Sequence, residues 1–210
     1  MSVSFSKIDP TLRRRCIDTM RMLAVDAIEA AKSGHPGACL GGSDLMMGLI
    51  LGPMRFDSGD PKWPNRDRFV MSKGHASMMI YAALHLCGYD LTLDEIRRFR
   101  QLGSRATGHP EYPLLPGIET STGPLGQGFA TGVGMALAGK MLAERFNTPD
   151  FSPIDYRVFA YCGDGDMMEG ISYEAGSLAG HLGLGNMVYI YDSNEISIEG
   201  DMDVAFNEDV

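Results

Sequence analysis

The stretch that decides the fold runs from residue 156 to residue 200 and reads YRVFAYC-GDGDMMEGISYEAGSLAGHLGLG-NMVYIY-DSNEISIEG. Its apolar run at 158–162 is rich in β-branched and aromatic residues and predicts a strand. The small residues that follow, up to Gly183 and Gly185, predict a helix, and residues 187–191 predict a second strand. The order strand, helix, strand indicates a βαβ unit, and therefore a parallel sheet in an α/β protein.

Polar residues follow both predicted strands. Asp164 comes directly after the first strand, between Gly163 and Gly165, and Asn194 lies just past the second. Parallel sheets hold their ligands at these carboxyl ends. A carboxylate, an amide carbonyl and a backbone carbonyl after Asn194 are oxygen ligands that suit Mg2+ or Ca2+, and the glycines would let a diphosphate approach the backbone. We therefore predict a metal–diphosphate site, although an Asp-Gly pair can also be a simple turn.

Composition narrows the class of protein. The chain has 210 residues, 44% of them hydrophobic, and a formal net charge of −9, which argues against a general nucleic-acid binder. No apolar run is long enough for a membrane span and residues 1–10 contain no signal peptide, so we expect a cytoplasmic protein. There are four cysteines without C-x-x-C spacing: Cys16, Cys39, Cys87 and Cys162. Three of them lie inside or beside apolar segments and are expected to be small buried hydrophobes.

The first third of the chain predicts two helices joined by a short turn. Asp9-Pro10 is a helix-start pair, and Gly34 is expected to cap that helix at its C-terminus. The turn that follows holds His35, which could be a functional residue or a plain turn residue. A second helix, mostly buried, is predicted over residues 41–51.

A short strand is predicted at residues 68–71, with Ser72-Lys73-Gly74-His75 directly after it. A helical run follows, so His75 is expected in the first turn of a helix. Free backbone N–H groups at such a position attract anions, and an imidazole adds a further donor.

Residues 92–123 predict a capped helix and then a long loop. Thr92 and Glu95 form a capping box, and the arginines of this helix are expected on its solvent face: Arg97, Arg98 and Arg100. The loop 103–123 contains His109 and is long enough to be either functional or disordered. A helix of small residues is expected to run from there to about Phe146.

Six motifs then give the chain a family resemblance: SGHPGACLGG (33–42), DRFVMSKGHAS (67–77), FRQLGSRATGHPE (99–111), STGPLGQG (121–128), GDGDMMEGISYEAGSLAGHLGLG (163–185) and YDSNEISIEG (191–200). In this order they resemble the N-terminal, diphosphate-binding part of transketolases, which are thiamine-diphosphate enzymes. The resemblance implies an α/β fold with a three-layer, doubly wound parallel sheet and helices on both faces. Residues 1–210 would form a single diphosphate-binding domain, incomplete at its C-terminus.

The resemblance also implies a role for each matching position. The metal, Mg2+ or Ca2+, would be held by Asp164, Asn194 and the carbonyl of Ile196. Contacts to thiamine diphosphate would come from His75, Gly123, Gly165 and Asn194, with Pro124 and Leu125 along the thiazolium. His35 and His109 would face the ketose substrate. Glu169 and Glu174 would lie at a subunit interface beside the glutamate that activates the cofactor, although as bare residues they are more simply helix-surface charges.

The implied activity is reversible transfer of a two-carbon ketol group from a ketose phosphate to an aldose phosphate. The family's pyrimidine-binding domain has no counterpart in these residues, so activity would need a homodimer of a longer protein or a partner chain that carries this domain. Residues 207–210 resemble a helix start without its helix, and we expect a fragment of a longer protein. The alternatives are a non-catalytic chain that binds metal and cofactor, or a related enzyme such as dihydroxyacetone synthase. No nucleic-acid or membrane partner is expected.

Overall fold

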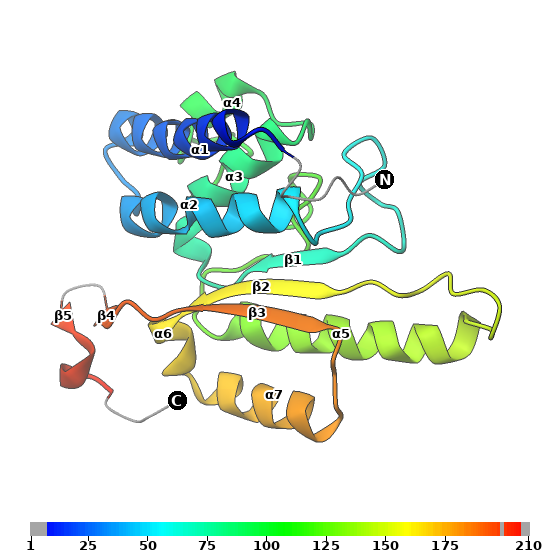
Figure 1. Ribbon diagram of the computed structural model, residues 1–210. Coiled ribbons are helices and arrows are strands. Elements are labelled where there is room, and N and C mark those ends of the chain that lie inside the picture. Colours follow the sequence, from blue (N-terminus) through cyan, green and yellow to red (C-terminus); the bar gives the residue numbers. More distant parts are fainter. Residues whose placement is uncertain (1–7, 198–199, 207–210) are drawn as a thin grey trace. The chain divides into compact units, whose positions relative to one another are not determined.

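The computed structural model describes residues 8–197 and 200–206 (Figure 1). The chain divides into two compact units: Met1–Arg66 with His75–Ile118, and Asp67–Gly74 with Glu119–Val210. We call them the helical unit and the sheet unit. The expected helix start at 207–210 lies outside the described residues.

The sheet unit is built on three parallel strands in the order β1 (Arg68–Met71), β2 (Val158–Gly163) and β3 (Met187–Asp192) (Figure 1). Ala160 of β2 pairs with Val70 of β1 and with Tyr189 of β3. The central strand β2 is buried along its whole length. A parallel sheet with crossover helices confirms the α/β class expected from the sequence.

Helices follow the strands of this unit as their sequence pattern predicts, with one correction. Helix α5 (Gln127–Phe146) ends where the small-residue pattern places it. The single helix expected after Gly163 is instead two helices, α6 (Asp164–Met167) and α7 (Gly170–His181), with Glu169 as the N-cap residue of α7. The chain turns at this point because Asp166 bonds back to the Gly163 N–H and forward through its carbonyl to Ser172.

The core of the sheet unit lies between α5 and the sheet. Its buried cluster consists of Val133, Ala136, Tyr156, Val158 and Leu184. The Tyr156 hydroxyl donates to the carbonyl of Met135 at 3.0 Å, so the ring is buried without leaving its polar atom unpaired.

Glycines allow α5 to approach the sheet closely, and this gives a first prediction. A Cβ added at Gly128 would lie 2.5 Å from the Cα of Ser72, a backbone atom that cannot move aside. We expect Gly128→Ala to lower the free energy of unfolding by about 2 kcal/mol or more, because overpacked cores shift the backbone. Urea unfolding measures this value.

Gly134 in the same helix is the matched control. A Cβ there meets no atom within 4 Å, so Gly134→Ala should stabilise α5 by roughly 0.5–1 kcal/mol. Equal effects of the two substitutions would contradict the close packing at Gly128.

A short antiparallel pair, β4 (Ile196–Ser197) and β5 (Gly200–Asp201), follows β3, and the 3-10 turn η3 (Met202–Val204) ends the described chain. Ile196 pairs with Asp201 across this ribbon. The backbone that carries Asn194 and Ile196 is therefore the connection between the sheet and a small hairpin.

The helical unit begins with α1 (Pro10–Ala31), which Asp9 caps by accepting N–H bonds from Thr11 and Leu12. The C-terminal end differs from the expectation: Lys32, not Gly34, adopts the left-handed cap conformation, with φ 51°. Gly34 lies in the turn beyond, where a Cβ would come within 2.8 Å of Ile28. Glycine is required at this position by its φ of 148° and by the close packing against Ile28, not by a helix cap.

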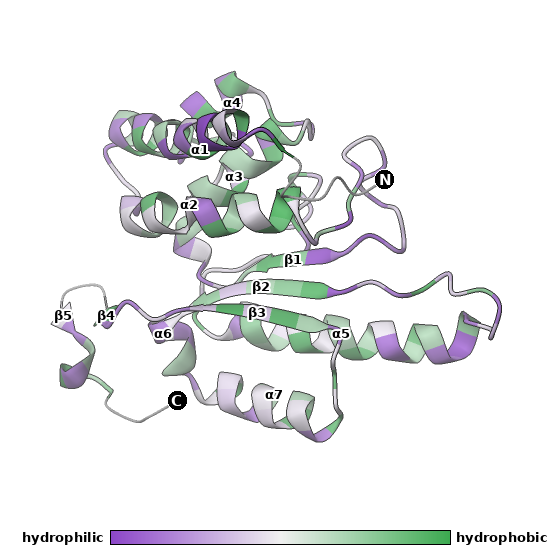
Figure 2. Ribbon diagram, viewed as in Figure 1, coloured by the Kyte–Doolittle hydropathy of each residue, from purple (hydrophilic) through white to green (hydrophobic). Residues whose placement is uncertain are grey.

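Three further helices complete this unit. Helix α2 (Pro36–Leu51) starts five residues before the predicted Gly41, because Pro36 takes the first helical position, where no N–H is needed. Helix α3 (Ser77–Leu86) is buried from Ser77 to Leu84 and is the most continuously apolar helix of the unit in Figure 2. Helix α4 (Leu93–Arg97) starts at the predicted capping box of Thr92 and Glu95.

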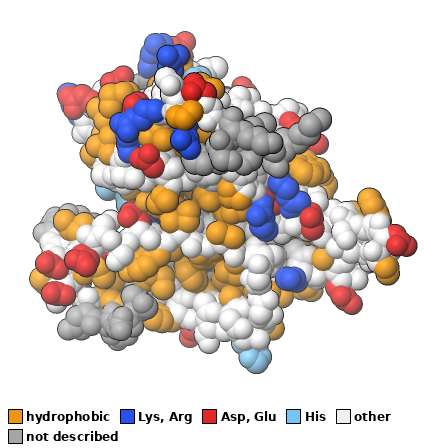
Figure 3. All heavy atoms as spheres, in the orientation of Figure 1, with side chains coloured by type: hydrophobic (Ala, Val, Ile, Leu, Met, Phe, Trp, Pro, Cys, Tyr) orange, Lys and Arg blue, Asp and Glu red, His pale blue; other side chains and the backbone are white. Residues whose placement is uncertain are grey.

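The predicted loop 103–123 is ordered and packed. Ala106, Pro110, Leu115 and Ile118 are buried within it. All four cysteines are free; Cys39 and Cys162 are buried, whereas Cys16 and Cys87 are partly exposed, so two rather than the expected three are fully buried. The face drawn in Figure 3 carries acidic and basic side chains without a continuous basic patch, in keeping with the negative net charge. Among the described residues no helix is both long and apolar enough to cross a membrane.

Candidate metal and cofactor site

Asp164 occupies the position at the carboxyl end of β2 that the sequence assigned to it. Its side chain is 3% exposed. Oδ2 accepts the backbone N–H groups of Asn194 and Glu195 at 2.9 and 2.8 Å, and Oδ1 accepts the hydroxyl of Tyr191. The carboxylate therefore ties the end of β2 to the turn after β3, as expected for neighbouring parallel strands.

Asn194 lies in that turn and Ile196 is the first residue of β4, directly after it; both are exposed. The Asn194 side-chain oxygen accepts the N–H of Ile196 at 3.2 Å, so the amide oxygen faces the turn backbone. Glu195 between them has a left-handed backbone, φ 58°, which directs its N–H inward to Asp164. The predicted ligand residues are thus gathered into one hydrogen-bonded turn.

The donor set fits a hard divalent cation. Asp164, Asn194 and the Ile196 carbonyl would offer oxygen atoms only and a single negative charge, which leaves positive charge for phosphate oxygens. Among the described residues there is no group of three or more His, Cys, Asp or Glu side chains that could hold a metal. That finding argues against a histidine- or cysteine-rich metal centre among these residues. It does not bear on a site formed by one carboxylate, one amide oxygen and one backbone carbonyl.

The glycine positions of the predicted cofactor contacts pack tightly in the sheet unit. A Cβ at Gly74 would lie 2.7 Å from the backbone N of Gly123, and one at Gly165 would lie 3.0 Å from Leu125. Gly123 itself has φ 148°, a conformation that other residues rarely adopt. The turn 122–126 therefore lies against both the end of β1 and the start of α6, with Pro124 exposed at its tip.

Asp166 is an unpredicted part of this arrangement. Its fully buried carboxylate accepts the Ser72 hydroxyl at 2.8 Å, the Gly126 N–H at 2.9 Å and the Gly163 N–H at 3.0 Å. These donors come from the ends of β1 and β2 and from the start of α5. Asp166 therefore fixes three backbone segments that surround the predicted diphosphate position. Its place two residues after Asp164 was the only sequence signal.

Lys73 and Asp192 form a second unpredicted contact, a largely buried ion pair with Nζ and Oδ2 at 2.6 Å. The lysine side chain crosses Gly163, where a Cβ would lie 2.8 Å from Nζ. Burial disfavours the Asp192 carboxylate, but the Lys73 hydrogen bond and charge outweigh burial and lower the pKa of Asp192. The pair joins the carboxyl ends of β1 and β3 over the end of β2.

Glu169 and Glu174 are both exposed, at the N-cap and in the second turn of α7. Glu174 lines a shallow hollow with Tyr173, Ser177, Leu178 and His181. Surface positions of this kind are compatible with the predicted interface role and equally with solvated charges, so their role stays a prediction.

The three predicted histidines belong to the helical unit. His35 is the N-cap residue of α2, and its ring centroid lies 5.0 Å from that of His75. His75 lies in the 3-10 turn η2 (Gly74–Ala76) rather than in the first turn of the α-helix as predicted. Burial and then the charge of Arg100 lower the pKa of both His35 and His109, and His35 lowers that of His109 further.

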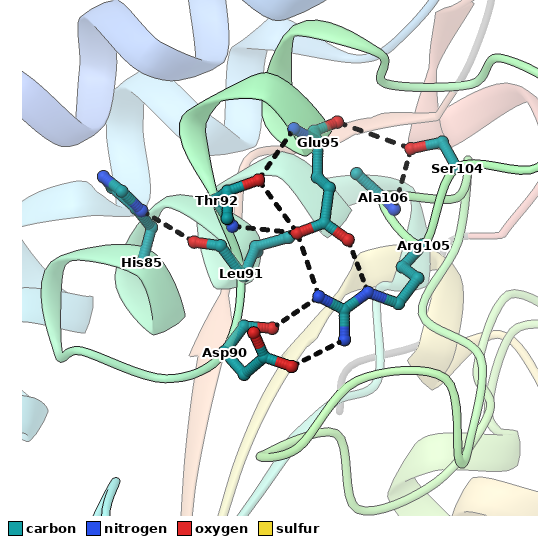
Figure 4. A network of polar contacts seen from close by, with 8 residues as sticks. All are labelled: His85, Asp90, Leu91, Thr92, Glu95, Ser104, Arg105 and Ala106. Atoms are coloured by element: carbon teal, nitrogen blue, oxygen red, sulfur yellow. Dashed lines mark hydrogen bonds and ion pairs between the residues drawn. The ribbon is translucent and has the colours of Figure 1, made fainter.

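A polar network anchors the segment that leads to His109 (Figure 4). The guanidinium of Arg105 donates through Nη2 to Glu95 at 2.9 Å and through Nη1 to Asp90 at 3.1 Å. Ser104 donates to the Glu95 carbonyl and accepts the Ala106 N–H. The capping box of α4 and the following loop are thereby one hydrogen-bonded structure.

This network predicts a pH-dependent contribution to stability. Hydrogen bonds from Arg105 lower the pKa of Glu95 to about 2, below its value of about 4.3 in an unfolded chain. The stabilisation is therefore complete above about pH 4.5 and is lost as the pH falls toward 2. We expect Glu95→Gln to cost about 1–2 kcal/mol at pH 7, since the pair is bidentate and only partly exposed.

Urea unfolding at pH 7 and at pH 2.5 measures this difference. Asp94→Asn is the matched control, because Asp94 pairs with Arg97 in the same helical turn but both side chains are largely exposed. It should change stability by less than about 0.5 kcal/mol. A cost for Glu95→Gln that is the same at both pH values would contradict the prediction.

The sequence and the structure of this chain are both similar to those of known transketolases. Residues 12–210 match the family described as transketolase, thiamine diphosphate binding domain. Transketolase 2 of Xanthobacter flavus is 56% identical over 90% of this chain and 28% of its own length. The crystal structure of transketolase from Pichia stipitis in complex with sedoheptulose-7-phosphate aligns with a TM-score of 0.91 at 52% identity, over 94% of this chain and 29% of that chain. Transketolase from Campylobacter jejuni gives 0.89 at 48% identity, over 96% and 31%.

The family match assigns this α/β domain, with its parallel sheet, to the thiamine diphosphate-binding type. More particularly, the chain belongs to the transketolase family and corresponds to its N-terminal part. It spans about 30% of the length of the curated relatives that it matches.

Proposed function

We propose that this chain supplies the metal- and diphosphate-binding half of a transketolase active site. The observation that carries the proposal is the buried Asp164 carboxylate bonded to the turn of Asn194 and Glu195, in a chain of this family. The activity would be transfer of a two-carbon ketol group between sugar phosphates. Relatives crystallised with sedoheptulose-7-phosphate and xylulose-5-phosphate support this class of substrate.

Asp164, Asn194 and the Ile196 carbonyl would hold Mg2+ or Ca2+. Gly165 and Gly123 would let the diphosphate of thiamine diphosphate approach the backbone, and Leu125 would lie along its thiazolium ring. When bound, thiamine diphosphate supplies a carbon nucleophile that the side chains of the protein lack. The contribution of these residues is to bind and orient it, and Asp166 keeps their backbone segments in place.

His35, His75 and His109 would serve as hydrogen-bonding groups for the sugar and the cofactor. The lowered pKa values of His35 and His109 favour the neutral form of these two imidazoles. A neutral imidazole has one donor and one acceptor nitrogen, so it can bind a hydroxyl group in either sense and can take up or release a proton. Glu169 and Glu174 would place carboxylates at the interface with a second subunit, beside the glutamate that activates the cofactor.

Activity would require residues beyond these 210, from a partner subunit or from a longer form of this chain. The test combines the 210-residue chain with candidate partner chains that carry a pyrimidine-binding domain, and measures ketol transfer from xylulose 5-phosphate to an aldose phosphate. Calorimetry with thiamine diphosphate and Mg2+ is done in parallel. Turnover with one of the partner chains would support the proposal that this chain is part of a transketolase.

The second candidate is a non-catalytic chain that binds metal and cofactor. The family's activating glutamate belongs to the pyrimidine-binding domain, which has no counterpart in these 210 residues, and this favours the alternative for these residues alone. Cofactor binding without turnover, whichever partner is present, would favour this alternative. The coding sequence after Val210 helps to distinguish the two candidates. If it continues for several hundred residues, the longer chain is the protein whose activity should be assayed. The acceptor, and thus the distinction from dihydroxyacetone synthase, needs an assay with free formaldehyde as well.

A further inference from the structure

Arg100 does not lie on the solvent face of α4 as its spacing suggested. It follows the end of the helix with a left-handed backbone, φ 60°, and its N–H donates to the carbonyl of Ala106 at 3.0 Å. Such a conformation costs an arginine of order 1 kcal/mol and persists only where the surroundings hold it. The side chain is consequently turned inward and only half exposed.

The guanidinium reaches the turn that carries His35. Nη1 donates to the Ser33 hydroxyl at 2.6 Å, two residues before the histidine and 67 residues from the arginine in sequence. Ser33 and Gly34 link the end of α1 to the start of α2, so this bond fixes the entry of the His35 turn.

The same side chain lies against the turn that carries His109. A Cβ added at Gly108 would come within 3.1 Å of Nε and 3.5 Å of Cζ of Arg100. Any larger residue at Gly108 would therefore displace the guanidinium. The buried Nε–H has no acceptor among the described residues, which shows that shape rather than a full set of hydrogen bonds determines this contact.

The remaining side of the His109 turn is held by α3 and by the loop itself. Ser77 donates to the Gly108 carbonyl at 2.9 Å, and Thr107 donates to the His109 carbonyl at 2.6 Å. Tyr81 bonds to Thr107 at 3.0 Å. With Arg105 anchored as in Figure 4, the loop between α4 and His109 is fixed at both ends, and Arg100 bridges it to the His35 turn.

We propose that Arg100 is a positioning residue, which sets the His35 and His109 turns at a fixed separation so that both imidazoles bind one polyhydroxylated ligand. The assignment rests on the proposed function for the identity of that ligand, a sugar phosphate. The positioning itself is a property of the helical unit. The positive charge of Arg100 also acts on the same two imidazoles. Burial and then Arg100 lower the pKa of both His35 and His109, and His35 lowers that of His109 further. The His75 ring is the further titratable group beside His35.

The test is a proton NMR titration of the five histidines in the full 210-residue chain, with Arg100→Gln, Arg100→Lys and Arg98→Gln. Arg100→Gln should raise the pKa of both His35 and His109 and move both sets of ring signals, while His181 on α7 stays unchanged. Arg100→Lys should restore the two pKa values in large part, because the charge remains. Arg98→Gln, an exposed arginine two positions earlier, should leave all five signals in place.

Ser33→Ala keeps the charge and removes only the acceptor of Nη1, so it separates positioning from electrostatics even if Arg100→Gln folds poorly. It should move the ring signals of His35 without the rise in pKa expected for Arg100→Gln. Unchanged signals of both histidines in Arg100→Gln, or a movement of His181 as large as theirs, would overturn the proposal. Because this readout needs neither cofactor nor turnover, it stays informative if the ketol-transfer assay fails.

Discussion

Asp164→Ala is expected to weaken metal-dependent binding of thiamine diphosphate by about 100-fold or more. The carboxylate is the one negative charge in the predicted ligand set, and divalent cations bind weakly to neutral oxygen atoms alone. The substitution also releases the N–H groups of Asn194 and Glu195, so the turn that carries the second ligand loses its tie to β2. Loss of a tie of this kind alone commonly costs 10- to 100-fold in metal affinity.

Calorimetric titration of thiamine diphosphate with and without Mg2+ measures this effect. Asp150→Asn, which removes an exposed carboxylate from the loop before β2, is the matched control and should bind as the unaltered chain does. Asp164→Asn refines the test, since it keeps the side-chain shape while removing the charge. If Asp164→Ala retained full affinity, the metal site would have to lie elsewhere.

Asp166→Asn should be the most destabilising single substitution at the sheet edge, at a cost of about 3–5 kcal/mol. The buried carboxylate accepts three donors, and an amide would turn an N–H2 group toward at least one of them. A loss of this size is a large part of the 5–15 kcal/mol typical of a folded domain. Asp166→Asn should lower cofactor affinity only because it unfolds part of the protein, since Asp166 is not itself one of the predicted ligands.

Urea unfolding of Asp166→Asn and Asp164→Asn in parallel provides the comparison. Both side chains are buried and each accepts three hydrogen bonds, but all three donors of Asp164 belong to exposed residues that water can reach. Asp164→Asn should therefore be clearly less destabilising than Asp166→Asn. The reverse order would show that the turn after β3 contributes more to stability than the contacts of Asp166.

Part of the candidate site was predictable because its residues follow local patterns. The strands β2 and β3 could be read from apolar runs, and the parallel order then brings Asp164 to Asn194 without further information. The capping box at Thr92 was predictable for the same reason, since its partners are three residues apart. These features depend on short-range sequence and on one rule of topology.

Other residues of the site could not be recognised from the sequence. Helical spacing placed Arg100 in solvent, yet a positive φ just beyond α4 turns it to Ser33. Asp166 could not be singled out, because its donors Ser72 and Gly126 are 94 and 40 residues away. The ion pair of Lys73 could not be predicted for a similar reason, because its partner Asp192 lies 119 residues further along the chain.

The sequence by itself determined most of the helices, the strands β2 and β3 with their parallel order, and the oxygen-rich chemistry at the ends of these two strands. Hydrophobic period, cap residues and turn residues act over a few positions, so they can be read in one dimension. The tertiary structure decided which buried polar groups hold that chemistry in place: Asp166, the Lys73–Asp192 pair and Arg100. Each of these must satisfy or neutralise a group that is distant in sequence, and such partners meet only when the chain has folded.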